Sequence, residues 1–292
     1  MKKYGKIVAI VMLVISLSVV FVACNKSKGG FEYIEKDNEI IIKAFQDNSQ
    51  ITTMVVPDEI NGMPVVKIDT IGLANSEYLE EITIGKNIRE IAPMGVQNNQ
   101  KLKRYKVAEG NTSFKAVDGA LYTIDGKELV SYPLYSNIQK RPVLNEDGTP
   151  KKELGKELYQ DFVPFVKIAD GVEIIRPYAF YHARAIEKIE MADSVKIVGE
   201  AAFLDCWLLN DIKMSKNLEV VEKDAFTKNS LLTTITFYEN IKEIKAYAFY
   251  SCKNIKTVNF CRAESDVKLD KKWYPSDQGK NNKATVNWNF VA

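Results

Sequence analysis

The chain has 292 residues, with 40 lysines and arginines against 38 aspartates and glutamates, and its formal net charge is +2. A balance this even gives no basic excess for nucleic-acid binding, so no nucleic-acid partner is expected. The sequence contains one histidine and has no Gly-rich phosphate loop, no G-x-S-x-G and no C-x-x-C motif. We therefore expect neither an enzyme nor a cofactor or metal site.

The N-terminus has the features of an export signal. Three lysines within the first six residues precede an apolar run from Ile7 to Val22, which ends at the small residue Ala23. A charged start, an apolar middle and a small-residue end are typical of a secretory signal. The run is also near the lower length limit for an uncleaved transmembrane anchor, which is the alternative interpretation.

The end of this segment, FVAC at residues 21–24, resembles a bacterial lipobox, although Phe21 stands where an aliphatic residue is usual. The resemblance implies that residues 1–23 are a lipoprotein signal peptide and that Cys24 is lipidated and anchors the protein to a membrane. Residues 24–30 have the polar, Gly-containing composition of a flexible tether. Loss of the three leader lysines changes the formal charge from +2 to −1.

Residues 31–64 are predicted to be rich in β-structure. Three runs with strand-like composition, Phe31–Ile34, Glu39–Phe45 and Ile51–Val56, are separated by polar turn clusters. The pair Asn61-Gly62 follows them as a further turn signal.

From residue 65 onward a sequence motif of about 23 residues recurs. An Ala-Phe pair occurs four times at this spacing, with Phe180, Phe203, Phe226 and Phe249 in register, and apolar residues follow each Phe by six, nine and eleven positions. Leu73 and Val96 fill the Phe position in two earlier copies. The copies therefore occupy residues 65–107 and 163–262. A period between 20 and 29 residues with L-x-x-L-x-L predicts a β-rich leucine-rich repeat solenoid, in which the strands stack into a parallel sheet and each Phe lies in the core.

Residues 108–162 interrupt the repeats. Two Asp-Gly pairs, at residues 118–119 and 125–126, lie between apolar runs, and the second pair predicts a β-hairpin between Leu121–Ile124 and Leu129–Tyr132. The polar second half, residues 136–160, is predicted to be a surface loop.

Residues 263–292 lose the period and end in an alternating segment, which predicts a closing strand in a C-terminal cap. Trp273, Tyr274 and Trp288 are expected to cover the last open layer of the solenoid. The alternative is that these rings stack on sugars.

The consensus sequence of the repeat resembles the BspA-like leucine-rich repeats of bacterial surface proteins. It reads I-x-x-I-x-x-x-A-F-x-x-C/N-x-x-L-x-x-I-x-I, and Ile244–Phe260 is the most similar copy. The resemblance implies that the segment at residues 31–64 is an N-terminal cap and that the solenoid serves surface adhesion or protein binding. One departure is the absence of the Pro that often follows the strand in that family. Its place is taken by Gly85, Ala108, Ala192, Ser215, Tyr238 and Cys261.

The histidine and the cysteines are assigned to structural positions. His182 stands in a column filled elsewhere by surface residue types, so an exposed side chain is expected. Cys206 and Cys252 share one column two copies apart, which places them roughly 10 Å apart and beyond disulfide reach. We expect three free thiols, with Cys252 directed into the core and Cys261 away from it.

The outward positions of the repeat strands form the predicted binding face. On one sheet they would make a broad surface, charged at its N-terminal part and rich in hydroxyl groups at its end, which suits an extracellular or envelope protein partner. A carbohydrate-binding or nutrient-capture module, an inert spacer and plain solvated strand positions are the alternatives. The residues are Glu81, Thr83, Arg104, Lys106, Lys188, Glu190, Asp211, Lys213, Thr234, Thr236, Tyr238, Thr257 and Asn259.

Overall fold

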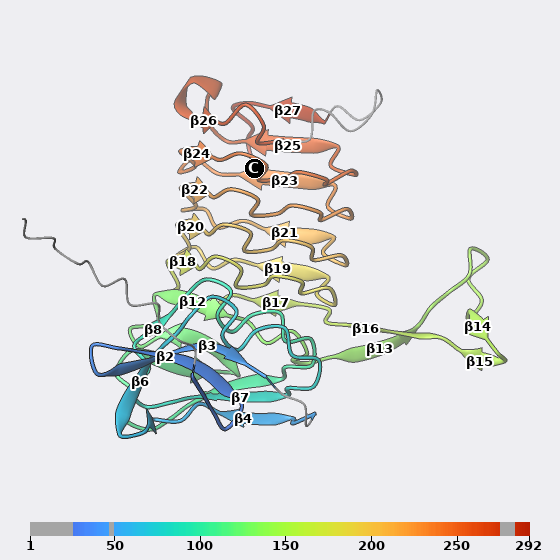
Figure 1. Cartoon of the computed structure of the whole chain (residues 1–292). Helices are drawn as coiled ribbons and strands as arrows, with labels where there is room; N and C mark the ends of the chain where they lie inside the picture. The colour runs from blue at the N-terminus through green and yellow to red at the C-terminus, as the bar shows by residue number, and fades with distance from the viewer. Residues whose placement is uncertain (1–25, 47–49, 275–283) are drawn as a thin grey trace, which may run out of the picture.

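The computed structural model describes residues 26–46, 50–274 and 284–292. The predicted signal peptide at residues 1–23 and the predicted lipidation site Cys24 lie outside these ranges. The described residues form a β-solenoid built as two stacks of coils, one N-terminal and one C-terminal (Figure 1). The predicted leucine-rich repeat solenoid is confirmed.

The N-terminal stack has strands on two faces. On one face β1, β2 and β3 run antiparallel and β3 pairs in parallel with β6, which also pairs with β5 and β8. On the other face β4, β7 and β9 form a parallel sheet. The strands are β1 (Lys26–Lys28), β2 (Phe31–Lys36), β3 (Glu39–Phe45), β4 (Thr53–Val55), β5 (Glu59–Ile60), β6 (Met63–Ile68), β7 (Glu81–Ile84), β8 (Glu90–Ile91) and β9 (Arg104–Val107).

An antiparallel meander joins the two stacks. It consists of β10 (Phe114–Val117), β11 (Ala120–Thr123) and β12 (Glu128–Ser131). Asp118 and Gly119 both have positive φ, 50° and 81°, as the tight turn between β10 and β11 requires. The predicted hairpin at the second Asp-Gly pair is confirmed as the pairing of β11 with β12.

The C-terminal stack begins at β12, which pairs in parallel with β18 through Leu129 and Ile175. On this face each coil adds a two-residue strand in the same register. The opposite face carries the strands of the L-x-x-L-x-L segments and ends at the predicted closing strand, β27. The elements are β17 (Val166–Lys167), β18 (Ile174–Ile175), β19 (Lys188–Glu190), β20 (Ile197–Val198), β21 (Asp211–Lys213), β22 (Val220–Val221), β23 (Thr234–Phe237), β24 (Glu243–Ile244), β25 (Thr257–Phe260), η1 (Glu264–Asp266), β26 (Lys268–Leu269) and β27 (Thr285–Asn287).

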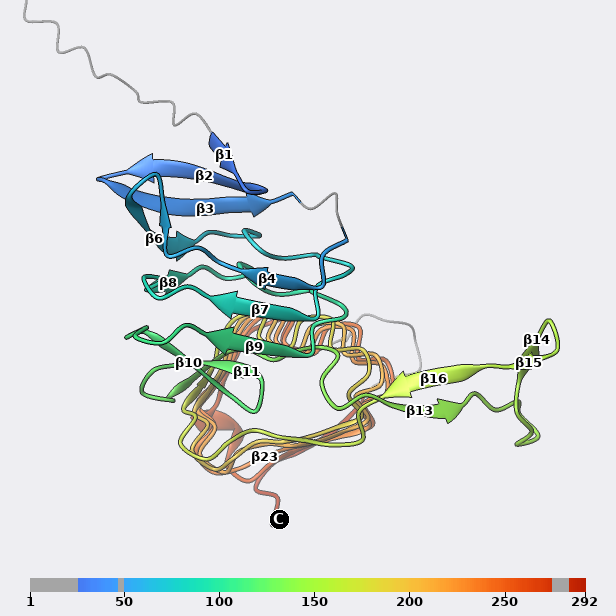
Figure 2. The same cartoon turned by 90° about the horizontal axis from the view of Figure 1, so that it is seen from below.

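Between β12 and β17 the chain leaves the stack as an arm that points away from both stacks (Figures 1 and 2). Its strands are β13 (Gln139–Pro142), β14 (Lys152–Glu153), β15 (Lys156–Glu157) and β16 (Tyr159–Phe162), paired as β13 with β16 and β14 with β15. This segment was predicted as a loop. Both of its faces meet solvent, so its sequence shows no apolar alternation that would have indicated strands.

Stacked phenylalanine rings form the centre of the C-terminal core. Ring centroids are 4.8 Å apart between Phe180 and Phe203, 5.1 Å between Phe203 and Phe226, and 5.0 Å between Phe226 and Phe249. All four rings are buried, as predicted. Tyr132 continues the stack below Phe180 at 4.9 Å, so the coil that starts at β12 belongs to the same core.

Trp288 and Trp273 cover the far end of this core. The Trp288 ring stacks on Phe260 with a centroid distance of 4.2 Å, and Trp273 meets Phe260 edge-on at 6.0 Å. Tyr274 also packs against the core. The predicted capping role of these rings is confirmed.

The position three residues after each repeat Phe holds a small residue. This residue leaves room in the core and also forms hydrogen bonds. Asn229 Nδ2 donates to the carbonyl oxygens of Phe203 and Phe226 at 2.8 and 2.7 Å. Cys206 and Cys252 sit in the same column, and their Sγ atoms lie 3.3 and 3.0 Å from carbonyl oxygens of the coil before. Both thiols are buried, whereas Cys261 is partly exposed, as expected from its position after the strand.

The two stacks have separate hydrophobic cores and run in different directions. Figure 2 looks along the C-terminal stack but shows the N-terminal stack from its side. At the junction, Gln97 Nε2 donates to the carbonyl oxygen of Val130 at 3.2 Å. His182 Nδ1 lies 2.9 Å from Asn98 Oδ1, so the turns of the two stacks also touch. In the described ranges no helix is both long and apolar enough to cross a membrane.

Candidate functional site

The predicted binding face is divided among three sheets. Glu81, Thr83, Arg104 and Lys106 lie on β4-β7-β9, the residues of β19 and β21 lie on β17-β19-β21, and the rest lie on β23-β25-β27 or just beyond β23. Among the described strands no ladder joins the first group to the others, because the hairpin β10–β11 lies against β9. The peptide N–H of Tyr105 donates to the carbonyl oxygen of Gly119 at 2.7 Å there. The outward columns therefore do not make one continuous surface.

Charged residues in these columns are paired along the stack. Glu81 lies 2.5 Å from Nε of Arg104 and 2.8 Å from Nζ of Lys106, and it is only 8% exposed although it was predicted to face solvent. The Lys106 ammonium and the Arg104 guanidinium hold the pKa of the Glu81 carboxyl below its usual value. These two side chains cover the carboxylate, which explains its burial on an outward position.

The pairs on β19 and β21 are looser. Lys188 Nζ lies 3.7 Å from Asp211, and Lys213 Nζ lies 3.3 Å from Glu190. Lys188, Asp211 and Lys213 are exposed. Exposed pairs of this kind contribute little to stability, so they can exchange partners at low cost.

The last part of the face is neutral. Thr234, Thr257 and Thr285 follow one another in one column, because β23, β25 and β27 are in register. In the next column Asn259 Nδ2 lies 3.3 Å from Thr236 Oγ1, and Asn287 Nδ2 lies 2.9 Å from Asn259 Oδ1. Asn259 is buried within this chain of hydrogen bonds. Tyr238, beside these columns, packs partly against the core.

The opposite sheet carries an alternating column of charges that the sequence analysis missed. Glu173 lies between Lys127 and Lys196 at 3.0 and 2.8 Å, and Lys242 lies 2.6 Å from Glu219. The alternation of sign at the repeat spacing was visible in the sequence. Because each charge has an opposite neighbour one coil away, this face is a self-neutralised, solvated surface.

A cluster on the turns of the C-terminal stack was also missed. Trp207 is 55% exposed, and its indole N–H donates to a carboxylate oxygen of Asp205. The guanidinium carbon of Arg184 lies 4.1 Å from the centre of the indole ring. Arg184 Nη2 also donates to the second carboxylate oxygen of Asp205 at 2.7 Å. Asp205 is 5% exposed, so a buried carboxylate fixes both the arginine and the tryptophan.

His182 belongs to this cluster and is partly buried rather than exposed as predicted. Its side chain is 19% exposed, its Nε2 lies 3.2 Å from Asp205, and its ring stacks on Tyr181 at 3.8 Å. Burial and the nearby Arg184 guanidinium lower the pKa of His182. The covering comes from the turn of the other stack at Asn98, which no local sequence pattern indicates.

A pocket of 310 Å³ opens beside this cluster, where the C-terminal turns, the N-terminal stack and the base of the arm meet. Apolar side chains and Trp207 form part of its wall, and amide, hydroxyl and carboxylate groups, the His182 imidazole and the Arg184 guanidinium form the rest. It is lined by Gln100, Leu134, Tyr135, Ile138, Gln160, Asp161, His182, Arg184, Ala185, Trp207 and Leu208.

One sequence signal could have identified Trp207. It stands four residues after the repeat Phe, in a column that holds polar residues in the other copies. A large aromatic side chain there departs from the repeat without adding to the core. The other residues of this column are Glu77, Gln100, Arg184, Ser230 and Lys253.

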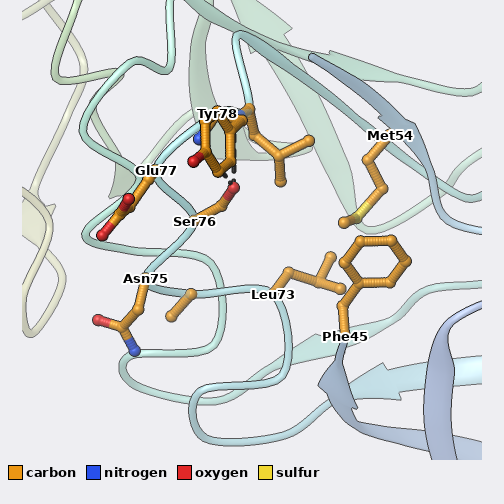
Figure 3. Close-up of a pocket in the computed structure, with 9 residues that line it drawn as sticks. Phe45, Met54, Leu73, Asn75, Ser76, Glu77 and Tyr78 are labelled. Atoms are coloured by element: carbon orange, nitrogen blue, oxygen red, sulfur yellow. Dashed lines mark hydrogen bonds between the residues drawn. The ribbon is translucent and has the colours of Figure 1, made fainter. Parts of the chain in front are cut away.

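A second pocket, of 250 Å³, lies in the N-terminal stack (Figure 3). Phe45, Met54 and Leu73 approach one another on one side of it, whereas Asn75 lies on the other side. The Ser76 hydroxyl oxygen in its wall already accepts bonds from two peptide N–H groups at 3.2 Å. This pocket therefore lies where Phe45 and Met54 of the predicted cap pack against the first repeat at residues 73–79.

Within the described residues no candidate metal site is found, because no three His, Cys, Asp or Glu side chains lie close enough together to hold an ion.

Several solved structures resemble this chain, among them the following three. The pneumococcal vaccine antigen PcpA is 13% identical with a TM-score of 0.48, over 87% of this chain and 91% of that chain. A leucine-rich cell surface protein from Faecalibacterium prausnitzii is 16% identical with a TM-score of 0.40, over 88% and 99%. A leucine-rich repeat protein from Bacteroides capillosus is 22% identical with a TM-score of 0.35, over 51% and 98%.

No curated protein matches the sequence. A family model does match, and it is described as the BspA type leucine-rich repeat region. It matches residues 20–122 and 155–270 in six copies, which is most of the chain. The repeat columns, the stacked coils and this match agree, and the chain belongs to the BspA-type leucine-rich repeat family.

Proposed function

We propose that this chain is an exported, lipid-anchored protein whose solenoid binds a protein partner outside the cytoplasm. The observation that carries the proposal is the outward surface of β19, β21, β23 and β25. There, charged and hydroxyl side chains stand in columns whose spacing is fixed by the stack. Rigid, extended solenoid surfaces of mixed polarity suit protein recognition, since little side-chain freedom is lost on binding.

The site of action is proposed from the leader and from the family. The lipobox-like ending at Cys24 supports a lipid anchor, and one similar structure is described as a cell surface protein. Metabolic labelling with a fatty acid should label the wild type but not Cys24→Ala. The variant Cys261→Ala should keep the label, because this thiol lies within the folded solenoid. Equal labelling of the wild type and Cys24→Ala would show that the anchor is wrong.

The binding surface is tested by exchanging charges instead of removing them. Replacing Arg104 or Lys106 would remove one of the two counter-charges of the covered Glu81 and would change stability together with the surface. The double variant Glu190→Lys with Lys213→Glu keeps an ion pair but reverses the pattern that a partner meets. We expect it to weaken binding by more than about tenfold, or 1.4 kcal/mol, with an unchanged melting temperature.

The matched control is the same exchange on the opposite sheet, Glu219→Lys with Lys242→Glu. It should leave the affinity unchanged, because that surface is not part of the proposed site. The measurement is the Kd of a partner captured by crosslinking from an envelope extract and then purified. A wild-type Kd for the Glu190 and Lys213 exchange would exclude this sheet, and capture of no partner would favour an inert spacer.

A further inference from the structure

We propose that the pocket beside Trp207 is a binding site for a neutral saccharide. This site is separate from the sheet of the C-terminal stack and does not depend on the protein partner proposed above.

The exposed ring of Trp207 is not needed by the coil that carries it. The same position in other coils is filled by polar residues such as Gln100 and Ser230, and those coils close equally well. Leaving a large apolar ring 55% exposed forgoes the stabilisation that burial would give. A ligand that covers the ring would recover this stabilisation.

The ring is held in one orientation before any ligand arrives. Its N–H donates to Asp205, and the guanidinium carbon of Arg184 lies over the ring, 4.1 Å from its centre. Asp205 is itself bound by Arg184 and by His182 at 2.7 and 3.2 Å. A buried carboxylate costs free energy unless its partners are well placed. In this coil the buried carboxylate of Asp205 holds a solvent-exposed ring in place. A side chain that is ordered before the ligand arrives is typical of a preorganised binding site.

The wall of the pocket also offers uncharged hydrogen-bonding groups. Gln100 comes from the N-terminal stack and is exposed, and Gln160 comes from β16 of the arm. Tyr135 follows β12 and donates its hydroxyl to Asp161 at 3.0 Å, which fixes that carboxylate at the edge of the pocket. Amides and a hydroxyl provide both donors and acceptors within one site.

A sugar ring matches this combination best. Its C–H face can lie on the indole while its hydroxyl groups exchange water for the amides of Gln100 and Gln160. An apolar side chain of a protein would cover the ring but would leave these amides without partners, which costs affinity.

The charges and the volume narrow the ligand class. The charge of Arg184 is already neutralised by Asp205, so Asp161 leaves the pocket with a negative character that disfavours phosphate, uronate and other anions. The volume of 310 Å³ is at the small end of ligand pockets, enough for one or two sugar units of a longer chain. The ligand is therefore a neutral oligosaccharide held at one end or at one internal unit.

The test is a binding screen on the full exported chain. Neutral oligosaccharides built from glucose, galactose, mannose and N-acetylglucosamine are compared with oligogalacturonate as the acidic probe, and contacts are detected by saturation-transfer NMR and indole fluorescence. We expect binding of at least one neutral probe and none of the acidic probe. A lack of binding by every neutral probe at about 10 mM, well above a Kd of about 1 mM, would overturn the proposal.

Variants then locate the site. Trp207→Ala should weaken binding of the neutral probe by at least tenfold, and Trp207→Phe should retain part of it, because a smaller ring still stacks. Asp205→Asn should weaken binding through the orientation of the ring, with a change in the fluorescence of Trp207. Tyr250→Ala is the matched control, because Tyr250 is 41% exposed on a turn of the same stack and should not affect the probe. Wild-type binding by Trp207→Ala would place the sugar elsewhere and refute the assignment, provided that its melting curve shows a folded protein.

Discussion

The phenolic oxygen of Tyr105 lies 2.8 Å from Oγ of Ser131, inside the junction of the two stacks. Tyr105 also donates to the carbonyl oxygen of Val96 at 2.8 Å. In the other repeats this column holds Ile or Val, so the hydroxyl is an addition to an apolar position. Burial raises the pKa of Tyr105 far above its usual value, which keeps the hydroxyl protonated as a donor.

Replacement of Tyr105 by Phe should destabilise the protein by about 1 to 3 kcal/mol, because the buried carbonyl of Val96 and the hydroxyl of Ser131 both lose a partner. Urea unfolding at neutral pH measures the change. Tyr159→Phe, on the exposed surface of the arm, is the control and should leave the midpoint in place. A Tyr105→Phe midpoint equal to that of the wild type would mean that this hydrogen bond does not hold the junction.

Phe226→Ala should cost about 3 to 5 kcal/mol, because the ring is fully buried between Phe203 and Phe249 and its loss leaves a cavity in the middle of the stack. The same truncation at Phe165, which is 51% exposed, should change stability by less than about 0.5 kcal/mol. Similar unfolding midpoints for the two variants would contradict the stacked core.

The Glu81 pair makes stability depend on pH. The folded-state pKa of Glu81 is lowered by Lys106 and Arg104, so its contribution is fully present above the ordinary carboxyl pKa and is lost as pH falls through the folded-state value. Glu81→Gln should therefore be less stable than the wild type at pH 7, and the difference should shrink on acidification. The measurement is the free energy of unfolding in urea between pH 7 and pH 3. A difference that stays constant across this range would show that the ion pairs do not act as described.

The three thiols should differ in reactivity. Burial raises the pKa of Cys206 strongly and that of Cys252 to about 12, whereas Cys261 is partly exposed. In the folded protein at pH 8 an alkylating reagent should modify Cys261 first, and unfolding without a reductant should expose all three. Intact mass after each step counts the modified sites. A single modified site in the unfolded chain would reveal a disulfide.

The outer arm should be dispensable for folding. Pro142 and Tyr159 face each other in the β13–β16 ladder, so a short Gly-containing turn can replace residues 143–158. The shortened chain should unfold in one transition at a similar temperature, because Arg141 keeps its ion pair with Glu187 at the base. Circular dichroism on heating tests this, and a broad or early transition would show that the tip packs on the solenoid.

The sequence was sufficient to predict the repeats, because each column of the coil is set by burial that recurs every 23 residues. It was not sufficient to place Tyr132 in the phenylalanine stack, since the arm separates the two halves of that coil by more than the repeat length. The Asp205 cluster was hidden for a related reason. Its burial depends on Trp207 and on the neighbouring turn, while polar residues are ordinary at its own position. The separation of β7 and β9 from the rest of the predicted face follows from the different directions of the two stacks, which no local sequence pattern indicates.

The uniform strand register from β18 to β26 means that the length of the C-terminal stack can change without changing its other contacts. Because every coil meets its neighbours through the same pairing, one more 23-residue copy between β22 and β24 would displace the C-terminal cap by about 4.8 Å. The junction and the surroundings of Trp207 would keep their contacts, since they lie nearer the other end of the stack. Length and recognition can therefore change independently in this architecture, and a relative with more copies could present the same pocket on a longer scaffold.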